Sequence, residues 1–277
     1  MGEKETATVE TPDLERVIDM LIEAALEIGS IQTRNQQHAK NLHKGVCEVK
    51  GAYSQYDAYC QSAFIAAAIK YDLEKTCGLI AEEDTTMVPY FNGESRFKLV
   101  IDPIDGTRNY IQQKSEFGTS MGLLEGDQFV AGLIYCPNLD AMFYAVKGEG
   151  TYSVDTKSME RKRVQIEAKD LVKAHVGYKV SQKAVAAMNF DGIETQMPVC
   201  AVYSMCSILL GNANTFSPMG AFIWDLGPGI LAVTEAGGYC SQRDWLKKEE
   251  KVPLCVIADS EKNSGAVMSY IKPTGGA

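Results

Sequence analysis

KLVIDPIDGTRNYI, residues 98–111, is the segment from which the architecture of the rest of the chain can be inferred. Its first four residues are predicted to form a short buried strand, and Pro103 is expected to end the strand pairing, because proline has no amide donor. Asp102 and Asp105 therefore stand at the carboxyl end of a strand, where the loops of α/β sheets border a crevice. The residues after the second aspartate look helical, so the segment predicts a strand, an acidic turn and a helix.

This acidic turn offers ligands for a cation next to donors for a phosphate. Mg²⁺ is usually held by one or two carboxylates together with substrate phosphate. Gly106 lets the backbone approach a ligand closely, and the amides of Gly106 and Thr107 would open a helix, whose N-terminus attracts anions. The alternative is that both aspartates are ordinary turn and cap residues, which the bare D-x-x-D spacing also permits.

The composition is typical of a soluble globular protein with one large or two fused domains: 277 residues, 45% hydrophobic and 23% charged. A net charge of −9, with no basic stretch that stands out as a phosphate-binding footprint, argues against a nucleic acid polymer as partner. No apolar run approaches the length of a membrane span. Residues 1–11 are expected to be a disordered tail without a signal peptide, so we expect a cytoplasmic protein that makes no membrane contact.

The cysteine pattern predicts reduced thiols in the core rather than a disulfide framework, because no C-x-x-C pair occurs. The three histidines do not cluster with cysteine at ligand spacing, which argues against a zinc site. The eight cysteines are Cys47, Cys60, Cys77, Cys136, Cys200, Cys206, Cys240 and Cys255.

Hydrophobic periodicity predicts alternating helices and strands, which together indicate a layered α/β fold. Helices are expected over about residues 12–34 (with Thr11 as N-cap), 57–71, 181–191, 203–212, 224–236 and 260–272. Strands are expected over residues 78–81, 98–101, 117–125, 128–136, 174–180, 197–202 and 252–258, with a meander over 141–154 and irregular chain over 216–222. The polar stretch 157–163 separates an N-terminal half, residues 12–156, from a C-terminal half, residues 157–277, and we expect the halves to pack together.

Three acidic sites occur at the ends of these elements, where functional side chains are often displayed. Glu82 and Glu83 follow a strand, Asp102 and Asp105 follow the next, and Asp225 opens a helix. Carboxylates held close together repel one another, and a shared metal removes that cost. Pairing Glu82 with Asp102, and Asp225 with Asp105, predicts two adjacent cation sites that could polarise a phosphate and supply a hydroxide.

Three blocks of this chain, in this order and spacing, resemble the inositol monophosphatase family of Mg²⁺-dependent, lithium-sensitive phosphatases. The blocks are GLIAEED (78–84), VIDPIDGTRNYI (100–111) and WDLGPGILAVTEAGG (224–238), and the similarity runs from about residue 12 to 275. The resemblance implies an alternating α-β-α-β-α sandwich of the inositol monophosphatase and fructose-1,6-bisphosphatase type, commonly a homodimer. It also implies a phosphomonoesterase whose partner is a small phosphorylated alcohol.

The resemblance assigns metal ligands for two Mg²⁺ ions and a looser third. Glu82, Asp102 and the backbone carbonyl of Ile104 would hold the first ion. Asp102, Asp105 and Asp225 would hold the second, and Glu82 would also reach the third.

The resemblance further assigns residues to the reaction itself. Thr107, hydrogen-bonded to Asp57, would orient the attacking water, and Glu82 counts with these two as catalytic. The amides of Gly106 and Thr107 would bind the phosphate. From the residues alone, the alternative role of Asp57 and of Asp225 is that of a helix cap.

The segment before Asp57 departs from the family pattern. The family usually shows an aspartate-leucine-valine-threonine run there, whereas this chain has GAYS at residues 51–54, with Ser54 in place of the threonine. The mobile-loop lysine of the family matches either Lys44 or Lys50, and the sequence does not choose between them.

The part of the sequence that would recognise the alcohol is also altered. Pro218 stands where inositol-specific members carry a glutamate, and Val199-Cys200 replaces the usual glycine with serine or threonine before Ala201. These changes put myo-inositol 1-phosphate in doubt as the substrate. An inositol phosphate, a sugar phosphate such as fructose 1,6-bisphosphate, a nucleotide such as 3′-phosphoadenosine 5′-phosphate, and a non-catalytic binding or regulatory role all stay open.

Overall fold

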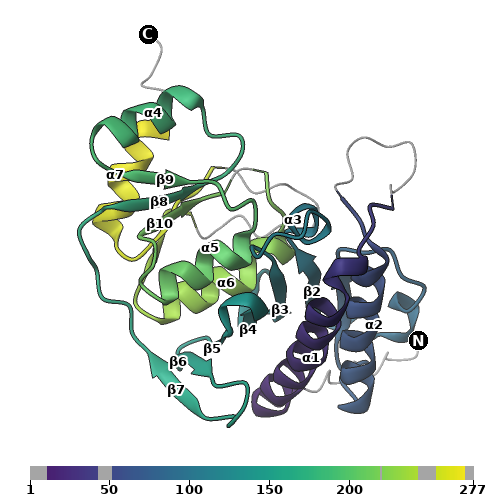
Figure 1. Cartoon of the computed structure of the whole chain (residues 1–277). Coiled ribbons are helices and arrows are strands. Elements are labelled where there is room, and N and C mark those ends of the chain that lie inside the picture. The colour runs from purple at the N-terminus through teal and green to yellow at the C-terminus, as the bar shows by residue number, and fades with distance from the viewer. Residues whose placement is uncertain (1–10, 43–51, 219, 243–253, 272–277) are drawn as a thin grey trace, which may run out of the picture.

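The computed structural model describes residues 11–42, 52–218, 220–242 and 254–271. Helices and two sheets alternate in five layers, and the predicted α-β-α-β-α sandwich is confirmed (Figure 1). α1 (Leu14–Asn35) and α2 (Gln55–Lys70) cover the outer face of the first sheet, and α5 (Ala201–Leu209) and α6 (Ile223–Glu235) lie between the sheets. α4 (Gln182–Phe190) and α7 (Glu261–Ile271) cover the second sheet.

Within the described residues, the first sheet has seven strands in sequence order, with β1 parallel to β2 and every other neighbour antiparallel. Its strands are β1 (Gly78–Ala81), β2 (Phe97–Asp105), β3 (Gly118–Glu125), β4 (Gln128–Cys136), β5 (Ala141–Val146), β6 (Gly150–Val154) and β7 (Arg161–Val164). β7 pairs with β6, so the sheet continues beyond residue 156. The division of the chain into two halves at that residue stays a prediction.

The second sheet has the order β11-β12-β10-β8-β9. Its strands are β8 (Lys173–Val176), β9 (Glu194–Gln196), β10 (Thr215–Ser217), β11 (Tyr239–Cys240) and β12 (Ile257–Ala258). Short 3₁₀ turns complete the described structure: η1 (Gln36–His38), η2 (Val88–Tyr90) and η3 (Pro137–Leu139). Among the described residues, none of the helices combines the length and apolarity that crossing a bilayer requires.

Three parts of the prediction lie outside the described residues: residues 1–10 of the tail, Cys47, and both candidates for the loop lysine, Lys44 and Lys50. The start of α1 differs from the prediction. Asp13 caps the helix in place of Thr11, because its carboxylate accepts a hydrogen bond from the amide of Glu15 at 3.0 Å.

The strand predicted over residues 197–202 is wrong. β9 ends before it, and α5 begins at Ala201, because the thiol of Cys200 caps the helix by accepting from the amide of Tyr203 at 3.3 Å. Residues 216–222, predicted to be irregular, begin in β10, which pairs parallel with β8 and antiparallel with β12.

β2 is buried on both faces, which explains its continuous apolar sequence. Leu99 and Ile101 pack with α1 and α2, whereas Val100 packs with the cluster that includes α5 and α6. The apolar stripe predicted on the first helix is buried against the first of these clusters: Val17, Ile18, Leu21, Ile22, Ala25 and Ile28.

α6 approaches the first sheet at a distance that only glycine permits. A Cβ atom on Gly132 of β4 would lie 2.9 Å from the Cα of Pro228, and one on Gly227 would lie 2.0 Å from the ring of Phe129. The glycines therefore fix the height of α6 above the sheet, and with it the position of Asp225 in the first turn of this helix.

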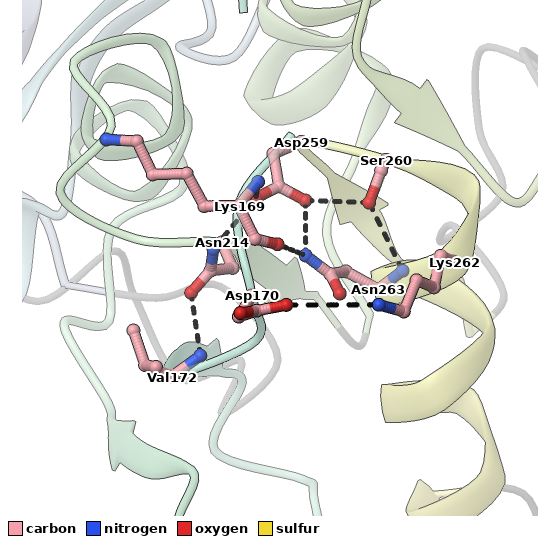
Figure 2. A network of polar contacts seen from close by, with 8 residues as sticks. All are labelled: Lys169, Asp170, Val172, Asn214, Asp259, Ser260, Lys262 and Asn263. Carbon is pink, nitrogen blue, oxygen red and sulfur yellow. Dashed lines mark hydrogen bonds and ion pairs between the residues drawn. The ribbon is translucent and has the colours of Figure 1, made fainter. Parts of the chain in front are cut away.

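A buried polar network joins α7 to the chain that connects the two sheets (Figure 2). The carboxylate of Asp259 accepts hydrogen bonds from the side-chain amides of Asn214 at 2.8 Å and Asn263 at 2.7 Å. Asn263 also donates to the carbonyl of Lys169 at 2.8 Å, and the oxygen of Asn214 accepts from the amide of Val172 at 3.0 Å. Since each oxygen of the buried carboxylate has a donor, the network is stabilising rather than a source of strain.

We expect Asn263→Ala to lower the free energy of unfolding by about 1–3 kcal/mol, because it leaves a buried acceptor of Asp259 and the Lys169 carbonyl with fewer donors. Chemical denaturation would measure the change. Lys262→Ala is the matched control, since its ion pair with Asp170 spans 3.9 Å between side chains that are 84% and 97% exposed. That variant should stay within about 0.5 kcal/mol of wild type, and equal losses in both variants would contradict the role given to the network.

Candidate active site

β2 does not end at Pro103, contrary to the prediction. It pairs with β3 as far as Asp102, is interrupted by a change of register, and pairs again at Asp105. A proline cannot donate to the ladder, so the strand forms a bulge at this point and then continues. The bulge keeps both aspartates on one rigid strand instead of on a loop.

Gly106 turns the chain sharply after the bulge into the short helix α3 (Thr107–Ile111). Its φ of +82° lies in the left-handed region, and an added Cβ would lie 2.8 Å from the carbonyl oxygen of Glu116. Both observations require glycine at this position. The turn thus brings the amides at the start of α3 beside Asp105.

The structure brings four carboxylates together: Glu82 directly after β1, Asp102 and Asp105 on β2, and Asp225 in the first turn of α6. Burial raises the pKa of the Asp102 carboxyl well above its ordinary value, and the charges of the other three carboxylates raise it further. Burial, with the charge of Asp105, also raises the pKa of Asp225 to about 7. Without a cation, burial and mutual repulsion therefore disfavour full ionisation of the cluster.

The first amides of two helices stabilise the remaining charge in this cluster. Asp105 accepts hydrogen bonds from the amide of Val202 in α5 at 2.6 Å and from the thiol of Cys200 at 3.0 Å. Asp225 accepts from the amide of Phe222, at the start of α6, at 2.7 Å. Free amides at a helix N-terminus, together with the helix dipole, favour a negative charge.

Asp57 and Thr107 form a second buried pair beside the bulge. Asp57 caps α2 by accepting from the amide of Ser54 at 2.9 Å and from its hydroxyl at 2.6 Å. The hydroxyl of Thr107 lies 3.1 Å from the other oxygen of Asp57 and 2.8 Å from the carbonyl of Ile104. Burial raises the pKa of Asp57 to about 6, against the hydrogen bonds from Ser54, so the carboxylate is mostly ionised at neutral pH.

Two buried glutamines hold the strand ends that carry the acidic residues, and sequence reasoning missed both. Gln32 of α1 donates to the carbonyl of Pro103, in the bulge, at 3.0 Å. Gln61 of α2 donates to the carbonyl of Glu83 at 3.0 Å and accepts from its amide at 3.2 Å. The available signal was a glutamine on the apolar face of a predicted helix, where a polar group must find a partner.

The donor set suits a hard divalent cation. Asp102 Oδ1 and the hydroxyl of Ser120, opposite it in the β2–β3 ladder, are buried without a hydrogen-bond partner among the described residues. Carboxylate oxygens are the ligands that Mg²⁺ and Ca²⁺ prefer. Over the described ranges, no three His, Cys, Asp or Glu side chains are already arranged as a metal cage.

Comparison with known proteins gives one consistent result. The pattern of the "Inositol monophosphatase family" matches residues 13–271. Inositol monophosphatase of Dictyostelium discoideum is 28% identical over 242 residues, covering 83% of this chain and 86% of the relative. Nus factor SuhB of Pasteurella multocida is 24% identical over 233 residues, covering 80% and 83%. The crystal structure of extragenic suppressor protein suhB from Bartonella henselae superposes with a TM-score of 0.76 at 22% identity, covering 94% and 99%.

We expect removal of divalent cations to make stability depend on the protonation of Asp225. Its pKa is raised by burial from 3.8 to about 7, so the folded chain keeps a proton that the unfolded chain releases. The resulting stabilisation is fully present below about pH 4 and is lost as the pH rises through about 7. It corresponds to about 4 kcal/mol, because one pKa unit is worth about 1.4 kcal/mol. In EDTA, the unfolding temperature of wild type should fall over this window relative to that of Asp225→Asn.

Asp170→Asn makes the same chemical change at a side chain that is 97% exposed, and it should follow wild type at every pH. Adding Mg²⁺ at pH 7 to 8 should raise the unfolding temperature of wild type more than that of Asp225→Asn. A gap between wild type and Asp225→Asn that does not change with pH would contradict the raised pKa.

Proposed function

The chain belongs to the inositol monophosphatase family, and we propose that it is a Mg²⁺-dependent phosphomonoesterase that hydrolyses a small phosphorylated alcohol. The observation that carries the proposal is the convergence of four carboxylates beside the Thr107–Asp57 pair. In the reaction, the oxygen of a water molecule forms a bond to phosphorus, the ester bond breaks, and the alcohol leaves with a proton.

Glu82, Asp102 and the carbonyl of Ile104 would hold one Mg²⁺, and Asp102, Asp105 and Asp225 a second, with Glu82 reaching a third. Bound ions of this kind polarise the phosphate and lower the pKa of water. The orphaned Oδ1 of Asp102 and the mutual repulsion of the carboxylates support this assignment. The amides of Val202 in α5 and of Phe222 at the start of α6 hold the carboxylates of Asp105 and Asp225 in place and offset part of the rise in their pKa that burial causes.

Thr107 and Asp57 would orient the attacking water. When the single hydroxyl hydrogen of Thr107 points to Asp57 rather than to the carbonyl of Ile104, the lone pairs of Thr107 Oγ1 are left to accept a hydrogen bond from the water. Ser54 fixes Asp57 from the opposite side through two hydrogen bonds. The amides of Gly106 and Thr107 would bind the phosphate, because the left-handed turn at Gly106 brings them to the start of α3.

We also propose that the chain forms a homodimer, as the family resemblance implies.

A non-catalytic regulatory role is the second candidate function. The relatives named SuhB motivate the regulatory role, as does the absence of a ready-made metal cage over the described ranges. Phosphate release from inositol, sugar and nucleotide phosphates, with and without Mg²⁺, separates an enzyme from a binding protein.

We expect Asp102→Asn to lower phosphate release by more than about 100-fold, since even changes to groups behind metal ligands cost about 10- to 100-fold. The fold should be retained, and the unfolding temperature in EDTA should equal or exceed that of wild type, because one of the repelling carboxylates is gone. Asp170→Asn serves as the control for the same substitution at an exposed site. Activity close to wild type in Asp102→Asn would refute its assignment as a shared ligand.

We expect millimolar Li⁺ to inhibit phosphate release, by occupying the second cation site that the resemblance implies. The rate should be measured at saturating substrate and fixed Mg²⁺, with the same concentration of K⁺ as the control for ionic strength. Equal rates in Li⁺ and K⁺ would count against the division of ligands between the two sites.

A further inference from the structure

A cavity of about 150 Å³ opens beside Asp105 and Asp225. On the proposed function, the alcohol of a phosphate ester bound at these carboxylates would extend into it. The two carboxylates form one wall. Away from them, the cavity is bordered by side chains from the C-terminal half of the chain, among them Val176, Tyr178, Val199, Phe216, Pro218 and Ala221. Engineered apolar cavities of about this volume hold one benzene-sized ring.

Few groups in this cavity can bind a hydroxyl. Apart from the two carboxylates, the lining side chains among the described residues that carry a polar hydrogen are those of Tyr178 and Cys200. Cys200 is engaged, because its sulfur donates to Asp105 at 3.0 Å and accepts from the amide of Tyr203 at 3.3 Å. Tyr178 is 62% exposed and therefore stands at the mouth.

These walls favour an apolar alcohol over a polyol. A hydroxyl that is removed from water without gaining a partner is destabilising, and an inositol or sugar ring carries several hydroxyls. An apolar ring in the same place is stabilised by its removal from water. The difference from one unpaired hydroxyl alone, about 1.4 kcal/mol, is a factor of about ten in kcat/KM.

Val199 forms part of the cavity wall, and its own backbone conformation is unfavourable. Its φ is +57°, which is rare for a β-branched residue, and its side chain is 38% exposed at the cavity. The next residue, Cys200, is anchored to Asp105 and caps α5, so the strain is imposed from the active site. A glycine would adopt this φ without strain, and the valine instead adds apolar surface facing the alcohol.

On the basis of the proposed phosphatase function, we propose that the substrate is a phosphomonoester whose alcohol carries an apolar ring next to the ester oxygen. Val199 is then a specificity-determining residue for this ring. The inositol phosphate or sugar phosphate suggested by the sequence becomes a poorer substrate, because its ring hydroxyls find too few partners here.

Cyclohexyl phosphate and myo-inositol 1-phosphate form the matched pair of substrates, since they share a six-membered ring and differ in its hydroxyls. In wild type, kcat/KM for cyclohexyl phosphate should be at least about tenfold higher. Val199→Gly and Val199→Ala should each reduce this ratio severalfold, with inhibition by inorganic phosphate unchanged. Met159→Gly is the control: Met159 also has a positive φ, +61°, and is 42% exposed, but it lies between β6 and β7, away from the cavity.

Faster hydrolysis of myo-inositol 1-phosphate, or a ratio that Val199→Gly leaves unchanged, would overturn the proposed alcohol class while leaving the phosphatase function intact. Failure to release phosphate from any ester in Mg²⁺ would instead remove the proposed catalytic function. In that case calorimetric titration still tests the cavity. Cyclohexylphosphonate should bind wild type severalfold more tightly than it binds Val199→Gly, and equal affinities would overturn the assignment of Val199.

Discussion

Buried carboxylates that repel one another are the constraint on which this structure depends. α2, α5 and α6 all begin at the same place, and their first amides are directed at Asp57, Asp105 and Asp225. Each charge-assisted hydrogen bond offsets part of the desolvation of a carboxylate. Because a helix has only one N-terminus, the layers must be stacked so that these three helices start together. The sandwich can therefore be understood as the arrangement that makes the acidic cluster tolerable.

The cluster also joins distant parts of the chain. Asp105 belongs to a strand of the first sheet, whereas the amide and thiol that bind it belong to the start of α5, nearly a hundred residues later. The close packing of Gly132 on Pro228 sets the height of α6, and so the position of Asp225. A change in the contact between the first sheet and the helices above it would therefore move the acidic residues relative to one another, which couples the stability of this interface to the geometry of the site.

The sequence predicted those features whose causes are local. The strand before Asp102, the glycine turn and the apolar stripe of α1 follow from an apolar run, glycine and helical periodicity, and the structure contains all three. Features set by long-range contacts were mispredicted or missed. Residues 197–202 have an apolar pattern that suits a strand, but the hydrogen bonds of Asp105 to the start of α5 favour a helix there. Gln32 and Gln61 bind carbonyls on other elements, and no local pattern reveals those partners.

On the proposed function, phosphate chemistry and alcohol recognition would be supplied largely by different parts of the chain. The bulge, Gly106, Thr107 and Asp57 lie in the N-terminal half, where the sequence blocks match the family closely. Val199, Phe216 and Pro218 lie in the C-terminal half and border the cavity without bonding to the acidic residues. Substitutions there can change the alcohol that is accepted at little cost to the buried carboxylates, because the helix amides that stabilise these charges belong to the backbone. Two of the departures from the family pattern, Pro218 and Val199-Cys200, are accordingly found on the cavity wall.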